Sequence, residues 1–187
     1  MAGEDGGGDA LFQNFDIIKW MEYRTVFDIV QAGYKSWLIV LIGVALTLTG
    51  ISMIVFPRFW SKIPFRGPEF MRRYGVYIFT GFFTIWTLLN FATTYSNYAY
   101  AKNEYLEGKA GVVEGAVSNF EPGTNERGSA YESFCVQSNC FTYSDYGEQT
   151  GFNTMAINGG PIREGLPVRV TFVGNTIVKL EVASSSK

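Results

Sequence analysis

Two long uncharged stretches constrain this chain more than any other feature of its sequence. The first runs from Ser36 to Phe56 and the second from Tyr74 to Thr94, and neither contains Asp, Glu, Lys or Arg. Each is 21 residues long, which gives about 31 Å of α-helix and matches the roughly 20 residues that cross a bilayer. Two such stretches with a short linker between them predict a transmembrane helical hairpin.

Two other interpretations of the first stretch are a cleaved signal peptide and a buried helix of a soluble protein. The stretch is too long for a signal peptide, begins too far into the chain and follows an acidic segment. Trp37 lies at one end and Phe59 and Trp60 lie at the other, as in the aromatic belts of membrane proteins. These features favour the membrane span.

A face of small residues on the first helix indicates close helix packing. Gly43, Thr47 and Gly50 recur at i, i+4 and i+7, which places them on one side of a helix. This face is expected to meet the second helix or another subunit, although Gly and Thr are also simply common in membrane helices. Asn90 either hydrogen-bonds across to the first helix or lies at the membrane interface, and we favour the interface.

The distribution of positive charge predicts the orientation of the hairpin. The linker, residues 57–73, contains one acidic residue and five basic ones, which are Arg58, Lys62, Arg66, Arg72 and Arg73. Residues 1–35 contain three basic and six acidic residues. Because short basic loops stay in the cytoplasm, we expect both termini to be extracytoplasmic in a two-pass protein of a bacterial inner membrane. The same basic residues are candidates for contact with anionic lipid.

The remaining segments outside the hairpin divide by composition. Residues 1–10 are glycine-rich and acidic, which is typical of a disordered tail. Residues 11–35 contain an amphipathic segment, expected as an interfacial helix, and a β-branched segment at 25–30 that could join a C-terminal sheet. Residues 95–110 contain no proline, so we expect the second helix to continue as a stalk. Residues 184–187 are interpreted as a frayed tail.

Residues 111–183 alternate between apolar and polar positions and are rich in turn residues, which predicts a small all-β domain. We expect five or six strands and, as one possibility, an OB-like barrel, a shape that does not specify a ligand. Residues 110–187 contain eight acidic and five basic residues, which argues against nucleic-acid binding. The candidate strands are 112–120, 131–136, 140–144, 151–156, 168–173 and 177–182.

The two cysteines fall on either side of a short polar turn. If Gln137 and Ser138 form a two-residue turn, Cys135 and Cys140 oppose each other at about 4.5 Å between Cα atoms, which is within disulfide reach. A turn at Ser138 and Asn139 would shift the register and separate the sulfur atoms. A disulfide is the favoured reading, and it would agree with export to an oxidising compartment.

The residue types available make catalysis an unfavoured interpretation. The chain contains no histidine, so histidine triads and histidine metal sites are excluded. We predict no catalytic residue, no metal site and no cofactor. The leading hypothesis is a non-enzymatic assembly or interaction subunit whose β domain docks a protein partner, with the lipid bilayer and other membrane subunits or further copies of the chain as partners. The alternatives are a homo-oligomeric pore or small transporter, and a membrane-bound enzyme using carboxylates or the cysteines.

Overall fold

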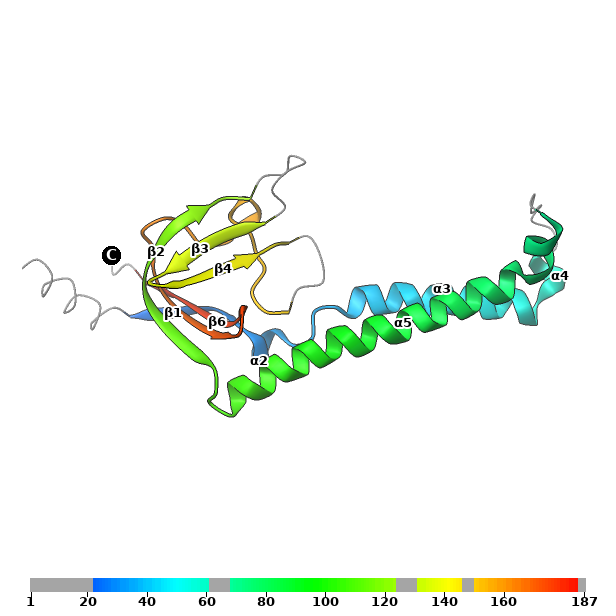
Figure 1. Ribbon diagram of the computed structural model, residues 1–187, viewed down its shortest axis with the longest axis horizontal. Helices are drawn as coiled ribbons and strands as arrows, with labels where there is room; N and C mark the ends of the chain where they lie inside the picture. The colour runs from blue at the N-terminus through cyan, green and yellow to red at the C-terminus, as the bar shows by residue number, and fades with distance from the viewer. Residues whose placement is uncertain (1–21, 61–67, 124–130, 146–149, 185–187) are drawn as a thin grey trace, which may run out of the picture. The chain divides into compact units, whose positions relative to one another are not determined.

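The computed structural model describes residues 22–60, 68–123, 131–145 and 150–184, except for the side chain of Arg72. These residues form two compact units (Figure 1). One unit is helical and spans Tyr34–Tyr100. The other is β-rich and contains residues 22–33 with the described part of 101–187. The predictions for residues 1–21, for Lys62 and Arg66, and for residues 185–187 lie outside the described residues.

Three helices account for most of the helical unit: α3 (Trp37–Val55), α4 (Pro57–Trp60) and α5 (Glu69–Leu106). α3 falls within the first predicted span, whereas α5 begins five residues before the second span and continues without a break into the predicted stalk as far as Leu106. Two helical stretches, Ile29–Val55 and Arg73–Leu106, are long and apolar enough to cross a membrane, judged by length and composition.

The C-terminal end of α5 is fixed by a glycine. Gly108 has a φ of 72° and donates its N–H to Tyr105 O at 3.1 Å. The next residue, Lys109, donates to Glu104 O at 3.0 Å. This pair of hydrogen bonds is a Schellman motif, which requires a left-handed residue and therefore favours glycine. The chain then enters the sheet at Gly111.

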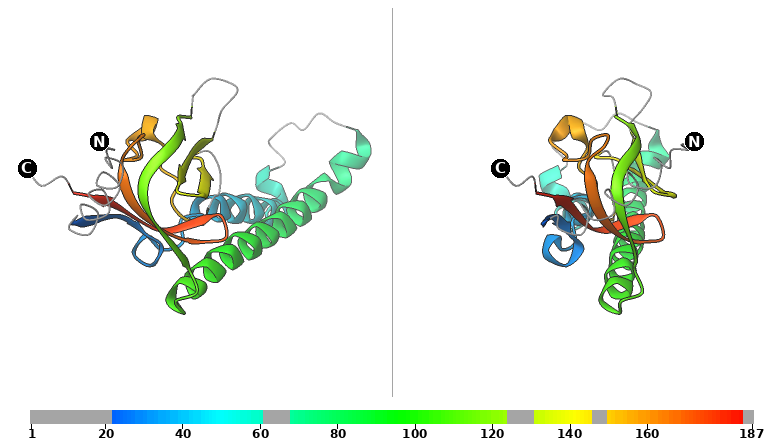
Figure 2. Two further views of the ribbon diagram at one scale, coloured as in Figure 1. Left: turned by 60° about the vertical axis from the view of Figure 1, so that its left-hand side comes forward. Right: turned by 90° about the vertical axis from the view of Figure 1, so that its left-hand side faces the viewer.

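The β unit contains one six-stranded antiparallel sheet with the order β1-β6-β5-β2-β3-β4. β2 serves both halves, because its first part pairs with β5 and its last part with β3, and both views of Figure 2 show it bending. A register shift between Ser118 and Glu121, with Asn119 at a φ of 50°, lies in this bend. The strands are β1 (Tyr23–Asp28), β2 (Gly111–Glu121), β3 (Glu132–Val136), β4 (Asn139–Tyr143), β5 (Pro167–Val173) and β6 (Thr176–Ala183).

The curl of the sheet encloses an apolar core. Phe141 of β4 meets Phe172 of β5 with ring centroids 5.2 Å apart, although two strands, β2 and β3, lie between them along the sheet. Phe134 is fully buried beside Phe141. The short helix α2 (Ile29–Ala32) adds the buried Ile29. Within the described residues no pairing joins β4 to β1, so closure as an OB-like barrel stays a prediction.

Helices combined with a small β domain are therefore confirmed. A strand that overlaps the segment suggested at 25–30 is present as β1, which pairs with β6 but covers residues 23–28, because residues 29 and 30 belong to α2. One predicted strand, 151–156, is wrong. Gly151 has a φ of 96°, and a Cβ there would crowd Ile177 O, so an extended strand does not fit. The segment instead leads into a 3-10 turn, η1 (Ala156–Asn158). Gly159 follows with a φ of 90°, a left-handed conformation that favours glycine.

Candidate functional site

The small residues of α3 contact α5 directly. Gly43 and Gly50 are the buried residues of α3. A Cβ added at Gly43 would overlap the hydroxyl of Thr87, and one added at Gly50 would overlap the hydroxyl of Thr80. The two glycines thus let the helices approach closely at two points, which are seven residues apart along α3. The structure pairs this face with the second helix of the same chain.

The other two residues predicted for helix packing behave differently. Thr47 lies between the glycines, and its buried Oγ1 has no hydrogen-bond partner within the described residues. Asn90 is half-buried and donates its side-chain amide to Trp86 O at 2.8 Å, within its own helix. Asn90 therefore makes no hydrogen bond to α3 in the described structure.

The hydroxyl groups along α5 are also satisfied within the helix. Each donates to the carbonyl four residues earlier at 2.6–2.8 Å: Thr80 to Val76, Thr84 to Thr80, Thr87 to Phe83 and Thr94 to Asn90. This arrangement removes the cost of placing hydroxyl groups in an apolar medium.

An aromatic cluster lies where α3 begins. The ring of Tyr34 contacts Phe91, Tyr95 and Tyr98 edge-on, with centroids 5.8–6.5 Å apart. Its hydroxyl lies 2.6 Å from Thr94 Oγ1. Rings with one polar edge at the end of an apolar helix pair are typical of the interfacial layer of a bilayer.

The described basic residues of the linker lie at its two ends. Arg58 is exposed on α4. Arg73 is exposed on α5, and its guanidinium lies 5.6 Å from the ring centroid of Tyr74. Arg72 belongs to the same first turns of α5. All three border the apolar helices, which is where positive charge determines orientation.

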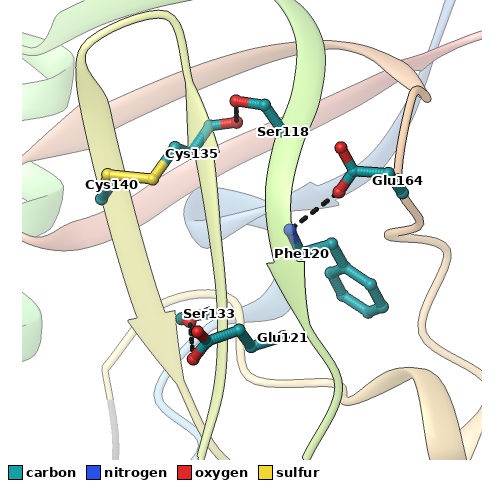
Figure 3. The surroundings of a disulfide bond; sticks show 7 residues. All are labelled: Ser118, Phe120, Glu121, Ser133, Cys135, Cys140 and Glu164. Carbon is teal, nitrogen blue, oxygen red and sulfur yellow. Dashed lines mark hydrogen bonds between the residues drawn. A yellow bond between two sulfur atoms is a disulfide. The ribbon is translucent and has the colours of Figure 1, made fainter.

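The cysteines are joined by a disulfide across β3 and β4, which Figure 3 shows. Cys135 opposes Cys140, and Val136 opposes Asn139, which is the register predicted from a Gln137–Ser138 turn. The Cα atoms are 4.0 Å apart, as expected for a non-hydrogen-bonded pair. Gln137 has a φ of 55°, and its side chain donates to Glu114 O at 2.8 Å, which holds this unfavoured turn residue in place.

A buried carboxylate that the sequence reasoning missed lies at the other end of this hairpin. Glu132 is fully buried, and it accepts hydrogen bonds from the Tyr143 hydroxyl and from the Ala156 N–H, the latter at 2.9 Å. Burial, together with the hydrogen bond to Glu132, raises the pKa of Tyr143. The alternation of strand 131–136 placed Glu132 on the same face as Phe134 and Val136, and this was the available signal.

A second carboxylate fixes the same loop. Asp145 accepts the N–H of Met155 at 2.8 Å and the side-chain amide of Asn158 at 2.5 Å. Together, Glu132 and Asp145 hold the segment around η1 against the β3–β4 hairpin. Both carboxylates are engaged in this structural role.

A polar cluster occupies one face of the sheet across β1, β2 and β5. Glu114 accepts hydrogen bonds from the Tyr23 hydroxyl at 2.7 Å and from Arg169 Nε at 2.8 Å. The Arg169 guanidinium also lies 4.5 Å from the centroid of the Tyr23 ring. Burial would raise the pKa of Glu114, but the hydrogen bonds from Tyr23 and Arg169 hold it below its usual value. Burial and the bond to Glu114 raise the pKa of Tyr23 to about 12.

The described residues contain no group of three or more His, Cys, Asp or Glu side chains placed to hold a metal ion. Three glutamates lie close together in the sequence at 121, 126 and 132. Glu121 accepts a hydrogen bond from Ser133 at 3.3 Å, and Glu132 is buried. Glu126 lies outside the described residues. Comparison with protein-family models, with curated proteins and with solved structures finds no match to this chain.

Proposed function

We propose that this chain is a two-pass membrane protein that acts as a non-enzymatic assembly or interaction subunit, with an extracytoplasmic β domain that docks a protein partner. The observation that carries the proposal is the paired helices themselves. α3 and α5 pack through glycine and threonine, whereas their other faces expose many large apolar side chains, such as Leu41, Leu48, Leu88 and Leu89.

The exposed apolar faces favour lipid as the medium around the helices. In the most apolar 18-residue part of each stretch, only 11% (first stretch) and 6% (second stretch) is buried. A core helix of a soluble protein is, by contrast, mostly buried. Apolar surface of this extent in water would cause aggregation. In lipid, small residues at the helix contact and large ones outside are the normal arrangement.

Two independent features support the orientation. The linker is basic, which favours the cytoplasmic side. The β domain contains a disulfide between Cys135 and Cys140, and such bonds persist in oxidising compartments outside the cytoplasm. Both features support a β domain on the side opposite to the linker.

The hydrogen-bonded polar groups of the β domain support a binding role over a catalytic one. Glu132 and Tyr143 bind each other in the core, and Glu114 binds Tyr23 and Arg169. These groups hold strands together, and their hydrogen bonds are satisfied without a substrate. These internally satisfied groups support a docking role for the β domain.

Thiol labelling of the full chain in intact cells tests the orientation. We would replace Cys135 and Cys140 by Ser, and add either Phe59→Cys in α4 or Ser184→Cys after β6. A membrane-impermeant maleimide is expected to label Ser184→Cys without lysis and Phe59→Cys only after lysis. Alkaline extraction of the membranes is expected to leave the protein in the pellet. The reverse labelling pattern, or release of the protein by alkali, would contradict the proposal.

Docking is tested separately by chemical cross-linking in native membranes. Purification of the cross-linked full chain is expected to yield a defined adduct with a second protein. Recovery of only uncross-linked chain would reject the docking role. If the thiol labelling in the same membranes is as expected, the proposed topology would still hold.

A further inference from the structure

β4 is an end strand whose outer backbone groups have no partner in the described structure. The Val136–Asn139 pair closes the two-residue turn, so the residues of β4 bonded to β3 are Asn139, Phe141 and Tyr143. The N–H and C=O groups of Cys140 and Thr142 therefore point away from β3. Both residues are exposed. Such a row of unpaired groups is a template for another strand.

β1, at the opposite end of the sheet, has features that protect an edge strand from pairing with another chain. β1 contains a bulge between Thr25 and Phe27, which twists an edge away from a further strand. It also carries the charged residues Arg24 and Asp28, and Asp28 accepts the N–H of Val30 to cap α2. β4 contains no charge, no proline and no bulge along Asn139–Tyr143.

The neutrality of β4 determines which occupant fits it. In a symmetric pair each edge residue lies within a few residues of its own copy on the other strand, so any charge on the edge would be close to a like charge. Asn139–Tyr143 presents none. The disulfide to Cys135 and the Gln137–Glu114 hydrogen bond fix the strand in one extended conformation before it pairs, which lowers the entropic cost of association.

We propose that β4 pairs antiparallel with β4 of a second copy of this chain, which extends the sheet across a twofold axis. In the register centred on Phe141, Cys140 of each copy exchanges backbone hydrogen bonds with Thr142 of the other. This inference rests on the proposed membrane anchorage, because the short contact needs copies held in one plane with one orientation. Such confinement raises the effective concentration of the second copy.

Site-specific photo-cross-linking tests the contact directly. A benzophenone amino acid is placed at position 142 of the full chain, and the matched control has it at position 25 of β1, which is also exposed. Illumination of native membranes is expected to give an adduct of twice the chain mass from position 142 and little from position 25. An adduct only with a different protein at position 142, or equal homodimer yields from both positions, would overturn the proposal.

Backbone variants separate strand pairing from mere proximity. Thr142→Pro removes an N–H that points away from β3, and proline is tolerated at such edge positions. Thr142→Val keeps that N–H and serves as the control. In lipid nanodiscs, mass photometry is expected to show a dimer for the wild-type chain and for Thr142→Val, and at least a tenfold loss of dimer for Thr142→Pro. A dimer fraction unchanged in Thr142→Pro would overturn the proposal.

Two checks keep a negative result interpretable. Thr142→Lys adds a charge to the edge without altering the backbone, and it is also expected to give monomers. This variant tests the pairing independently of any effect that proline has on the hairpin. Protection of Cys135 and Cys140 from maleimide shows that the hairpin is intact in each variant. A wild-type chain that is monomeric in nanodiscs, yet resists alkaline extraction from membranes, would reject the pairing while leaving the membrane anchorage intact.

Discussion

Glu132 illustrates what single residues contribute that local pattern does not reveal. Its position in an alternating strand pointed inward, yet a carboxylate is among the least common residues in a core. The structure resolves this conflict with two donors: the Tyr143 hydroxyl from the paired strand and the Ala156 N–H from a loop 24 residues away. A sequence shows the inward position, but the donor from η1 depends on long-range folding and could not be predicted.

Replacement of Tyr143 by Phe is expected to destabilise the β domain. The variant removes one of the two donors and leaves a buried carboxylate oxygen unsatisfied, which costs roughly 1–3 kcal/mol. The measurement is the unfolding temperature of the full chain in detergent. Tyr100→Phe is the matched control, because Tyr100 is 63% exposed. Equal unfolding temperatures for both variants would show that the hydrogen bond to Glu132 contributes nothing.

The Glu114 cluster is expected to make stability depend on acid. The pKa of Glu114 is lower in the fold than its ordinary value of 4.5, so its contribution is present above pH 4.5 and is lost as the pH falls through the lowered value. Because Arg169 keeps 39% of its side chain exposed, solvent screening limits that contribution to about 1 kcal/mol.

Glu114→Gln provides the measurement for this prediction. Thermal unfolding at about pH 7 is expected to show the variant less stable than wild type, and the difference should shrink below pH 4.5 as wild-type Glu114 becomes protonated. Glu107→Gln, directly after α5, is the control, because 57% of the Glu107 side chain is exposed. The same gap between Glu114→Gln and wild type at both pH values would exclude a role for the Glu114 charge.

At the scale of helices and strands, hydrophobic period predicted most of the fold. α3 follows from an uncharged run and the hairpin of β5 and β6 from clear alternation, whereas the helical stalk follows from the absence of proline after the second span. The strand predicted at 151–156 is absent because side chains bind the backbone there. Asp145 accepts a hydrogen bond from the N–H of Met155, and Glu132 accepts one from the N–H of Ala156. The backbone N–H groups of this segment therefore bind side-chain carboxylates instead of a neighbouring strand, and hydrophobic periodicity does not reveal such partners.

The contact between α3 and α5 gives a prediction at the level of elements. Gly50→Ala places a Cβ against the hydroxyl of Thr80, and such overpacking typically costs about 1–3 kcal/mol. Gly81→Ala on α5 is the control, because no atom lies within 4 Å of a Cβ there. The unfolding temperature in detergent is expected to fall for Gly50→Ala only.

A double variant distinguishes steric overlap from a general effect on the helix. Thr80→Ala removes the atom that the new Cβ would meet, so Gly50→Ala with Thr80→Ala should recover part of the lost stability. Strictly additive losses from the two substitutions would mean that the close approach at Gly50 does not hold these helices together.

For the whole molecule, sequence composition predicted the division into two units, but it did not predict how distant segments pair. The division into an apolar helical unit and a β-rich unit follows from where charge is absent and where alternation begins. The joining of β1 to β6 brings residues before the helices into the sheet formed after them. Because this pairing closes a loop of more than 140 residues, no local pattern specified it. If the helices span a membrane, β1 and β6 must lie on one side, which agrees with an even number of spans.

The charge asymmetry of the linker leads to the last prediction. Neutralising its basic residues is expected to weaken the orientation, because short cytoplasmic loops are selected by Lys and Arg rather than by net charge. The variant replaces Arg58, Lys62, Arg66, Arg72 and Arg73 by Gln, in a chain that also carries Ser184→Cys and lacks the native cysteines. Labelling of Ser184→Cys from outside intact cells should fall to a fraction of its starting value. A control with Arg163→Gln and Lys187→Gln, both in the C-terminal part of the chain, should label fully. Full labelling of both variants would show that the positive linker does not determine which side of the membrane the β domain occupies.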